Sequence, residues 1–144
     1  MICSAGKSRT ILLLIAMLLI GSRLEAARLR VLVLNGKDGK PASGRTVEIL
    51  TPGPSAAPLV KGKTDQQGFF EIGTDVLPDR VSVYVKGRLL CKGSRIGTSI
   101  QSIKEILSHG VVESNDCNNS VTHAQEPGLL ILFVRHENLS EILD

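Results

Sequence analysis

Short runs of alternating apolar and polar residues, divided by turn-forming residues, constrain the fold of this chain more than any other feature. In Arg80–Val85, for example, every second residue is a valine, and Ser82 and Tyr84 lie between the valines. Because side chains of a strand point alternately to its two faces, this spacing puts the valines on one face of a sheet. Asn-Gly and Asp-Gly pairs within residues 35–39 mark a turn between two other runs of this kind. The chain is therefore predicted to be mainly β, an antiparallel β-sandwich of about seven strands.

The segment "KTDQQGFFEIG", Lys63 to Gly73, is either a polar loop for a ligand or a bend between two strands. Asp65 is suited to accept a hydrogen bond from its own backbone two residues on, and Gly68 is suited to a positive φ. Aromatic residues, which are favoured in strands, follow directly. These features predict a hairpin turn at Asp65 and Gly68. A second hairpin is predicted near Gly87, with "RLLCK" as the partner of the valine-rich strand.

One helix is predicted over residues 99–110, within an insertion. Its apolar stripe at helical spacing consists of Ile100, Ile103, Ile106 and Leu107. Ser99 or Ser102 caps the start, and Gly110 ends the helix. Leu129–Val134 is apolar at every position, which predicts a strand with sheet on one side and helix or loop on the other.

The N-terminal segment predicts export rather than part of the fold. Lys7 and Arg9 precede the apolar run Ile11–Ile20, and small residues end the segment at Ala26 and Ala27. This order is typical of a secretory signal peptide. A membrane anchor is the competing interpretation, but a spanning helix needs about 20 apolar residues. We predict removal of residues 1–27, one domain over residues 28–144, and a secreted or periplasmic location.

Export changes the charge balance. The full chain has a formal net charge of +3, and residues 1–27 hold Lys7, Arg9 and Arg23 against Glu25, which leaves +1. The balance therefore indicates no nucleic-acid partner and no membrane insertion after cleavage.

Export also determines how the cysteines are interpreted. Removal of Cys3 leaves Cys91 and Cys117, and an oxidising compartment favours a disulfide between them. The chain contains no Cys-x-x-Cys motif for zinc or redox chemistry.

The first half of the predicted domain resembles the carboxypeptidase regulatory-like domain, a transthyretin-like (prealbumin-like) β-sandwich. The matching positions are Gly39, Lys40, Pro41, Gly44 and Val47, followed by Thr64, Asp65, Gly68 and Phe70. The resemblance covers about residues 28–87 and implies the fold and a non-catalytic attachment role in secreted and envelope proteins. The second half departs from the simple module and resembles small exported bacterial proteins of this kind.

No motif predicts a catalytic, cofactor-binding or metal-binding residue. A related fold occurs in hydroxyisourate hydrolase, whose C-terminal Tyr-Arg-Gly-Ser is absent from this chain, which ends in "EILD". A small hydrolase of that type, using His109, His123 or His136, is one alternative. Carbohydrate binding is another, with Tyr84 as the best contact residue.

The sequence thus predicts an exported, non-catalytic module that binds or braces another envelope or extracellular component. The expected partner is a protein, with a glycan as the alternative and no cofactor. Specificity is expected within residues 99–128. Sequons at Asn118 and Asn138 are acceptors only in a host with that pathway.

Overall fold

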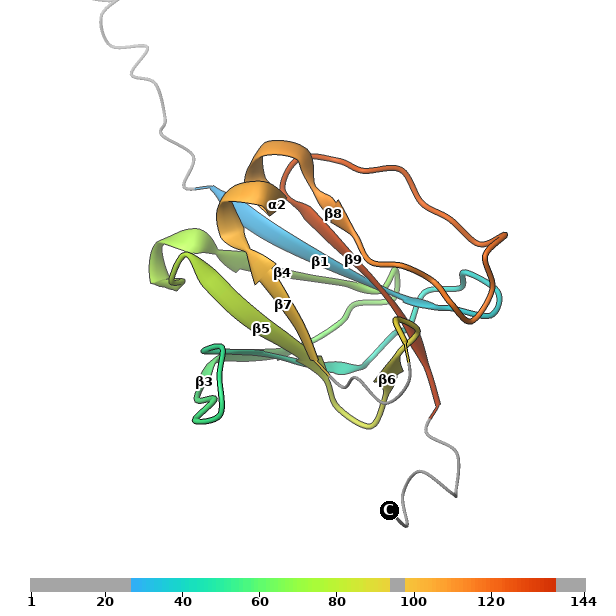
Figure 1. Ribbon diagram of the computed structural model, residues 1–144, viewed down its shortest axis with the longest axis horizontal. Coiled ribbons are helices and arrows are strands. Elements are labelled where there is room, and N and C mark those ends of the chain that lie inside the picture. The colour runs from blue at the N-terminus through green and yellow to red at the C-terminus, as the bar shows by residue number, and fades with distance from the viewer. Residues whose placement is uncertain (1–26, 94–97, 137–144) are drawn as a thin grey trace, which may run out of the picture.

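The computed structural model describes residues 27–93 and 98–136 and contains nine strands in two sheets (Figure 1). The first sheet consists of β4 (Phe69–Gly73), β1 (Arg28–Asn35), β9 (Leu129–Arg135) and β6 (Leu89–Leu90), with β8 (Val111–Val112) also paired to β9. The second consists of β3 (Pro58–Lys63), β2 (Thr46–Leu50), β5 (Arg80–Val85) and β7 (Thr98–Ser102). A short 3-10 helix, η1, covers Thr74–Val76, and the helix α2 covers Ile103–His109. Residues 1–26 of the predicted signal peptide, residues 94–97 and the sequon at Asn138 lie outside the described residues.

The prediction of a mainly β sandwich with one short helix is confirmed. Most neighbouring strands are antiparallel, as expected. The central pair of the first sheet differs, because β1 and β9 are parallel over six residue pairs, from Arg30 opposite Leu129 to Asn35 opposite Val134. Parallel strands need a long connection, and here the connection includes all the other strands and the helix.

The main core lies between the two sheets. It contains the alternate residues Leu29, Val31 and Val33 of β1, and alternate residues of β2 and β5 in the second sheet. The valines of β5 are fully buried in this core, as their spacing predicts. Burial of each such side chain contributes about 1.5–3 kcal/mol.

A second cluster covers the outer face of the first sheet. The remaining residues of the central strands form it: Leu32, Leu34, Leu129, Ile131 and Phe133, together with Cys91. Val112 and Val121, from β8 and the long segment that follows it, pack against these residues. The prediction that Leu129–Val134 is covered on both sides is therefore confirmed.

The predicted helix begins later than its apolar stripe suggests. Ile100 belongs to β7, opposite Ser82 of β5, and its side chain is 52% exposed. The helix starts at Ile103 because the side chain of Ser102 accepts a hydrogen bond from the backbone N–H of Glu105. Gly110 ends the helix at a φ of 78°. Strand pairing with β5 has thus overridden helical spacing over residues 98–102.

Both predicted hairpins were wrong, although the turns exist. The turn at Asp65 and Gly68 leads from β3 in one sheet to β4 in the other. The turn at Gly87 leads from β5 to β6, which pairs with β9 rather than with β5. In each case the chain crosses between the sheets, so the two strands on either side of the turn do not pair.

Within the described residues, no helix is long and apolar enough to span a bilayer.

Candidate anion-binding pocket

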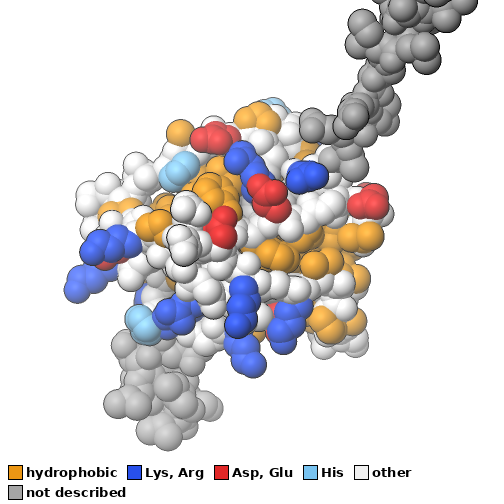
Figure 2. Space-filling view, turned by 180° about the vertical axis from the view of Figure 1, so that it is seen from behind, with side chains coloured by type: hydrophobic (Ala, Val, Ile, Leu, Met, Phe, Trp, Pro, Cys, Tyr) orange, Lys and Arg blue, Asp and Glu red, His pale blue; other side chains and the backbone are white. Residues whose placement is uncertain are grey.

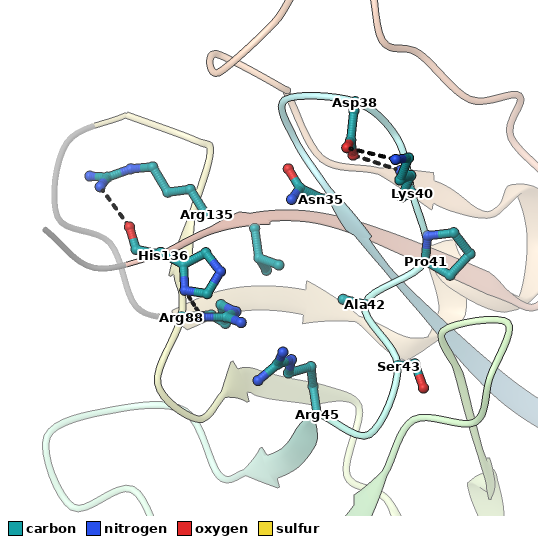
Figure 3. A pocket seen from close by; sticks show the side chains of 11 residues that line it. Asn35, Asp38, Lys40, Pro41, Ala42, Ser43, Arg45, Arg88, Arg135 and His136 are labelled. Atoms are coloured by element: carbon teal, nitrogen blue, oxygen red, sulfur yellow. Dashed lines mark hydrogen bonds and ion pairs between the residues drawn. The ribbon is translucent and has the colours of Figure 1, made fainter.

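A pocket of about 360 Å³ lies at the end of the sandwich where β1 and β9 both finish (Figure 3). The parallel pairing brings this pocket together, because it places Asn35 directly opposite Val134. Lys40 and Arg45, which follow β1, and Arg135 and His136, at the end of β9, therefore line the same cavity. A volume of this size suits part of a small molecule or one chemical group of a larger ligand.

A rigid turn forms one wall of the pocket. The backbone N–H of Asn35 donates to the carbonyl of Lys40 at 2.8 Å, and that of Gly39 donates to the carbonyl of Asn35 at 2.8 Å. The side-chain oxygens of Asn35 and Asp38 accept hydrogen bonds from backbone N–H groups two residues further along the chain. These contacts satisfy the polar groups of the turn locally, so the wall is held without a ligand.

Thr64 holds the adjacent wall, which carries Arg45. Its hydroxyl donates to the carbonyl of Ala42 at 2.6 Å and accepts from the backbone N–H of Arg45 at 2.9 Å. The backbone N–H of Thr64 also donates to the carbonyl of Arg45 at 2.9 Å. The predicted turn at Asp65 and Gly68 follows Thr64 and contacts β1. The backbone N–H of Val33 donates a hydrogen bond to the carbonyl of Gly68 at 2.9 Å.

The opposite side of the pocket contains a buried arginine. Arg88 is only 9% exposed, and its guanidinium donates to the carbonyl of Gly87 and to Nδ1 of His136. Figure 3 shows Arg88 and His136 on one side of the pocket, across from Asp38 and Lys40, with Arg45 in the lower part of the view. Because Arg88 has no acceptor atom, Nδ1 of His136 is the acceptor in this contact.

The charges that line the pocket are mainly positive. Lys40, Arg45, Arg88 and Arg135 are cations, whereas Asp38 is the acidic residue of the lining and lies 3.9 Å from the ammonium group of Lys40. Arg45 makes no ion pair with any residue in the described ranges. A guanidinium group presents N–H donors in a fork that matches a carboxylate, a sulfate or a phosphate. The pocket is therefore suited to an anionic group.

The three histidines considered as catalytic residues do not come together. His136 lines the basic pocket, whereas His123 lines a separate hollow beside Phe133. His109 lies at the C-terminal end of α2. In the described part of the chain, no three residues among His, Cys, Asp and Glu lie together as metal ligands would.

The other predicted site residues do not line this pocket. Cys91 and Cys117 form a disulfide with an S–S distance of 2.00 Å, which attaches β6 to the segment that covers the first sheet. Tyr84 is half-buried on the outer face of the second sheet, opposite Glu48 of β2 and Thr98 of β7.

A second polar cluster lies between β7 and β8. Ser99 donates to a carboxylate oxygen of Glu113, Gln101 donates to the same oxygen, and the ammonium group of Lys92 lies 2.9 Å from the other one. Ser99 is 2% exposed and Glu113 is 6% exposed. This cluster closes the gap between the edges of the two sheets, and its buried serine offers no surface to a ligand.

No sequence pattern indicated the basic pocket, because its cations lie on segments far apart in the chain. Only the pairing of β9 with both β1 and β6 brings them together. The Thr-Asp-x-x-Gly part of the family-like pattern was the one available signal, because Thr64 and Gly68 hold the wall that carries Arg45.

Comparison with known proteins identifies no family for this chain. No protein-family model matches it, and no curated protein shows significant sequence similarity to it. Among solved structures, a 9R-lipoxygenase from Cyanothece PCC8801 is similar over 73% of this chain, at 16% sequence identity and a TM-score of 0.36. The chain spans only 15% of the length of that lipoxygenase, and a similarity this weak indicates neither a family nor an activity.

Proposed function

We propose that this protein is an exported, non-catalytic module that binds or braces another envelope or extracellular component by holding an anionic group of that component. The observation that carries the proposal is a pocket lined mainly by cations, among which Arg45 makes no ion pair with any residue in the described ranges. The carboxypeptidase regulatory-like resemblance and the predicted signal peptide support a binding role outside the cytoplasm. The disulfide fits the same location, because such bonds persist in oxidising compartments.

The preorganised walls favour binding over catalysis. Thr64 and the turn after β1 already fix the backbone that carries Lys40 and Arg45, so the binding of an anion needs to order only their side chains. A hydrolase of the alternative type would need a base beside a nucleophile. His136 instead uses Nδ1 to accept from Arg88.

Titration of the purified exported protein with galacturonate, citrate and inorganic phosphate tests the proposal. We expect at least one of these anions to bind, and the Arg45→Gln variant to bind it about tenfold or more weakly, as loss of a charge-assisted contact implies. Arg80→Gln is the matched control, because Arg80 is an exposed arginine at the start of β5 and does not line the pocket. Equal loss in both variants, or no binding of any of the three, would overturn the proposal.

Two further measurements separate the alternatives. Intact mass of protein taken from outside the cytoplasm is expected to lack residues 1–27. Mass spectrometry of the bound anion is expected to recover it unchanged, whereas turnover that is lost in His136→Ala would support the hydrolase.

A further inference from the structure

The basic character of this end of the molecule extends past the pocket. Lys63 is paired with Thr46, the residue after Arg45, and the backbone N–H of Lys86 donates to the carbonyl of Thr46 at 2.9 Å. Lys63 and Lys86 are both exposed. Neither makes an ion pair with a residue in the part of the chain that the structure describes. Lys63, at the end of β3, and Lys86, which follows β5, thus flank Thr46, and Arg45 is the residue before Thr46.

The acidic residues lie mostly elsewhere. Figure 2 shows Lys and Arg side chains gathered in the lower half of the view, with Asp and Glu side chains mostly in the upper half. At the far end from the pocket, Arg28 lies near Glu71 and Arg30 lies near Glu126, so cations there are paired. Among the described residues, the end that carries the pocket therefore holds more cations than acidic residues, with Asp38 and Asp65 as its nearby acidic residues, whereas the other end has mixed charge. Such a distribution attracts anionic partners.

We infer that the partner is an acidic polysaccharide, which places one carboxylate or sulfate in the pocket and the next charged groups over Lys63 and Lys86. This inference rests on the proposed function of the pocket. A single small anion would occupy the cavity without using the two lysines, whereas a chain with a charge on successive sugar units contacts both parts. We define the basic end as the pocket together with Lys63 and Lys86.

A glycan accounts for this surface better than a nucleic acid. Proteins that bind single-stranded nucleic acids combine a basic groove with aromatic side chains on which bases stack. No aromatic residue other than His136 lines the pocket, and Lys63 and Lys86 carry no ring. The phenylalanines that follow the nearby turn, Phe69 and Phe70, instead pack against the hydrophobic clusters of the sandwich.

The experiment compares a polyuronate chain with its monomer, galacturonate, over a range of salt concentrations. We expect the polymer to bind more tightly than the monomer, with an affinity that falls as salt rises because bound counterions are released. The Lys63→Gln/Lys86→Gln variant is expected to reduce the slope of log affinity against log salt by about 2 for the polymer. Its affinity for galacturonate should stay within about twofold of the wild type, because these lysines lie outside the pocket.

The matched control removes two cations from the other end. Arg80→Gln/Lys104→Gln lowers net charge equally, at exposed positions on β5 and α2, and should leave the slope unchanged. An equal effect of both double variants would overturn the inference, because net charge alone would then explain binding. Urea unfolding of each variant checks that the fold is retained.

The outcomes distinguish this inference from the proposed function. Binding of galacturonate or phosphate without tighter binding of the polyuronate would overturn the acidic polysaccharide and leave the anion pocket intact. Tighter binding of DNA, polyphosphate or anionic vesicles than of the polyuronate would also overturn it. Failure of every anion to bind would overturn both.

Discussion

Thr64 is the residue on which the geometry of the pocket depends most. Its hydroxyl is both donor and acceptor to the segment that carries Arg45, although Thr64 itself is buried and does not line the pocket. It is therefore a positioning residue. The position also belongs to the pattern that resembles carboxypeptidase regulatory-like domains, so here the pattern residue supports a wall of the candidate site.

Replacement of this threonine should affect stability and binding together. Thr64→Val preserves the shape of the side chain but leaves the carbonyl of Ala42 and the N–H of Arg45 without this partner, which should cost about 1–3 kcal/mol in the free energy of unfolding. The affinity for a small anion should fall as well, because Arg45 is less well held. Urea unfolding and anion titration measure the two effects.

Thr51→Val provides a control at the other end of β2. The hydroxyl of Thr51 likewise accepts a hydrogen bond from a backbone N–H, that of Ala57, at 2.9 Å, and Thr51 does not line the pocket. Some loss of stability without any change in anion affinity is expected. If Thr64→Val behaved in the same way, Thr64 would have no positioning role.

At the level of elements, the boundary between β7 and α2 separates Ile100 from Ile106. Both isoleucines belong to the apolar stripe that predicted a single helix, but they lie in different elements. Ile106 is fully buried, whereas Ile100 is half exposed on the outer face of the second sheet. Ile106→Thr should lower the free energy of unfolding by at least about 2 kcal/mol, because it leaves a cavity and buries a hydroxyl. Ile100→Thr should change it by no more than about 0.5 kcal/mol, because both residues are β-branched and the site is exposed. Similar losses in urea unfolding of the two variants would contradict the boundary.

Sequence patterns predicted the elements better than their partners. The valines of β5 and the apolar stretch of β9 identify buried strands, because burial leaves a period in the sequence. Turn residues at Asp65 and Gly87 likewise identify where the chain bends. Neither the burial period nor the turn residues indicate which sheet the next strand joins. Both hairpin predictions were therefore wrong. The pocket could not be predicted for the same reason, since the pairing of β9 with β1 and β6 creates it.

For the whole molecule, the disulfide acts mainly on the unfolded chain. Cys91 and Cys117 are 26 residues apart in sequence, and a cross-link of this span removes conformational freedom worth about 3–4 kcal/mol from the unfolded state in the chain-entropy treatment. Reduction should lower the free energy of unfolding by about that amount, as measured in urea with and without reductant. Reductant should have no effect on the Cys91→Ala/Cys117→Ala variant. An unchanged unfolding midpoint on reduction of the wild type would show that the bond contributes no stability.

The parallel pairing of β1 with β9 also affects when the protein can fold during synthesis. These two strands form the centre of the first sheet, yet they are the first and the last strands of the described chain. A ribosome that has made everything before Leu129 has not yet supplied one of the two central strands. The closing contact joins residues about as far apart as this domain allows, and such contacts form slowly. Completion of the first sheet therefore waits for synthesis of β9, and until then the chain stays unfolded, as an export pathway for unfolded proteins would require.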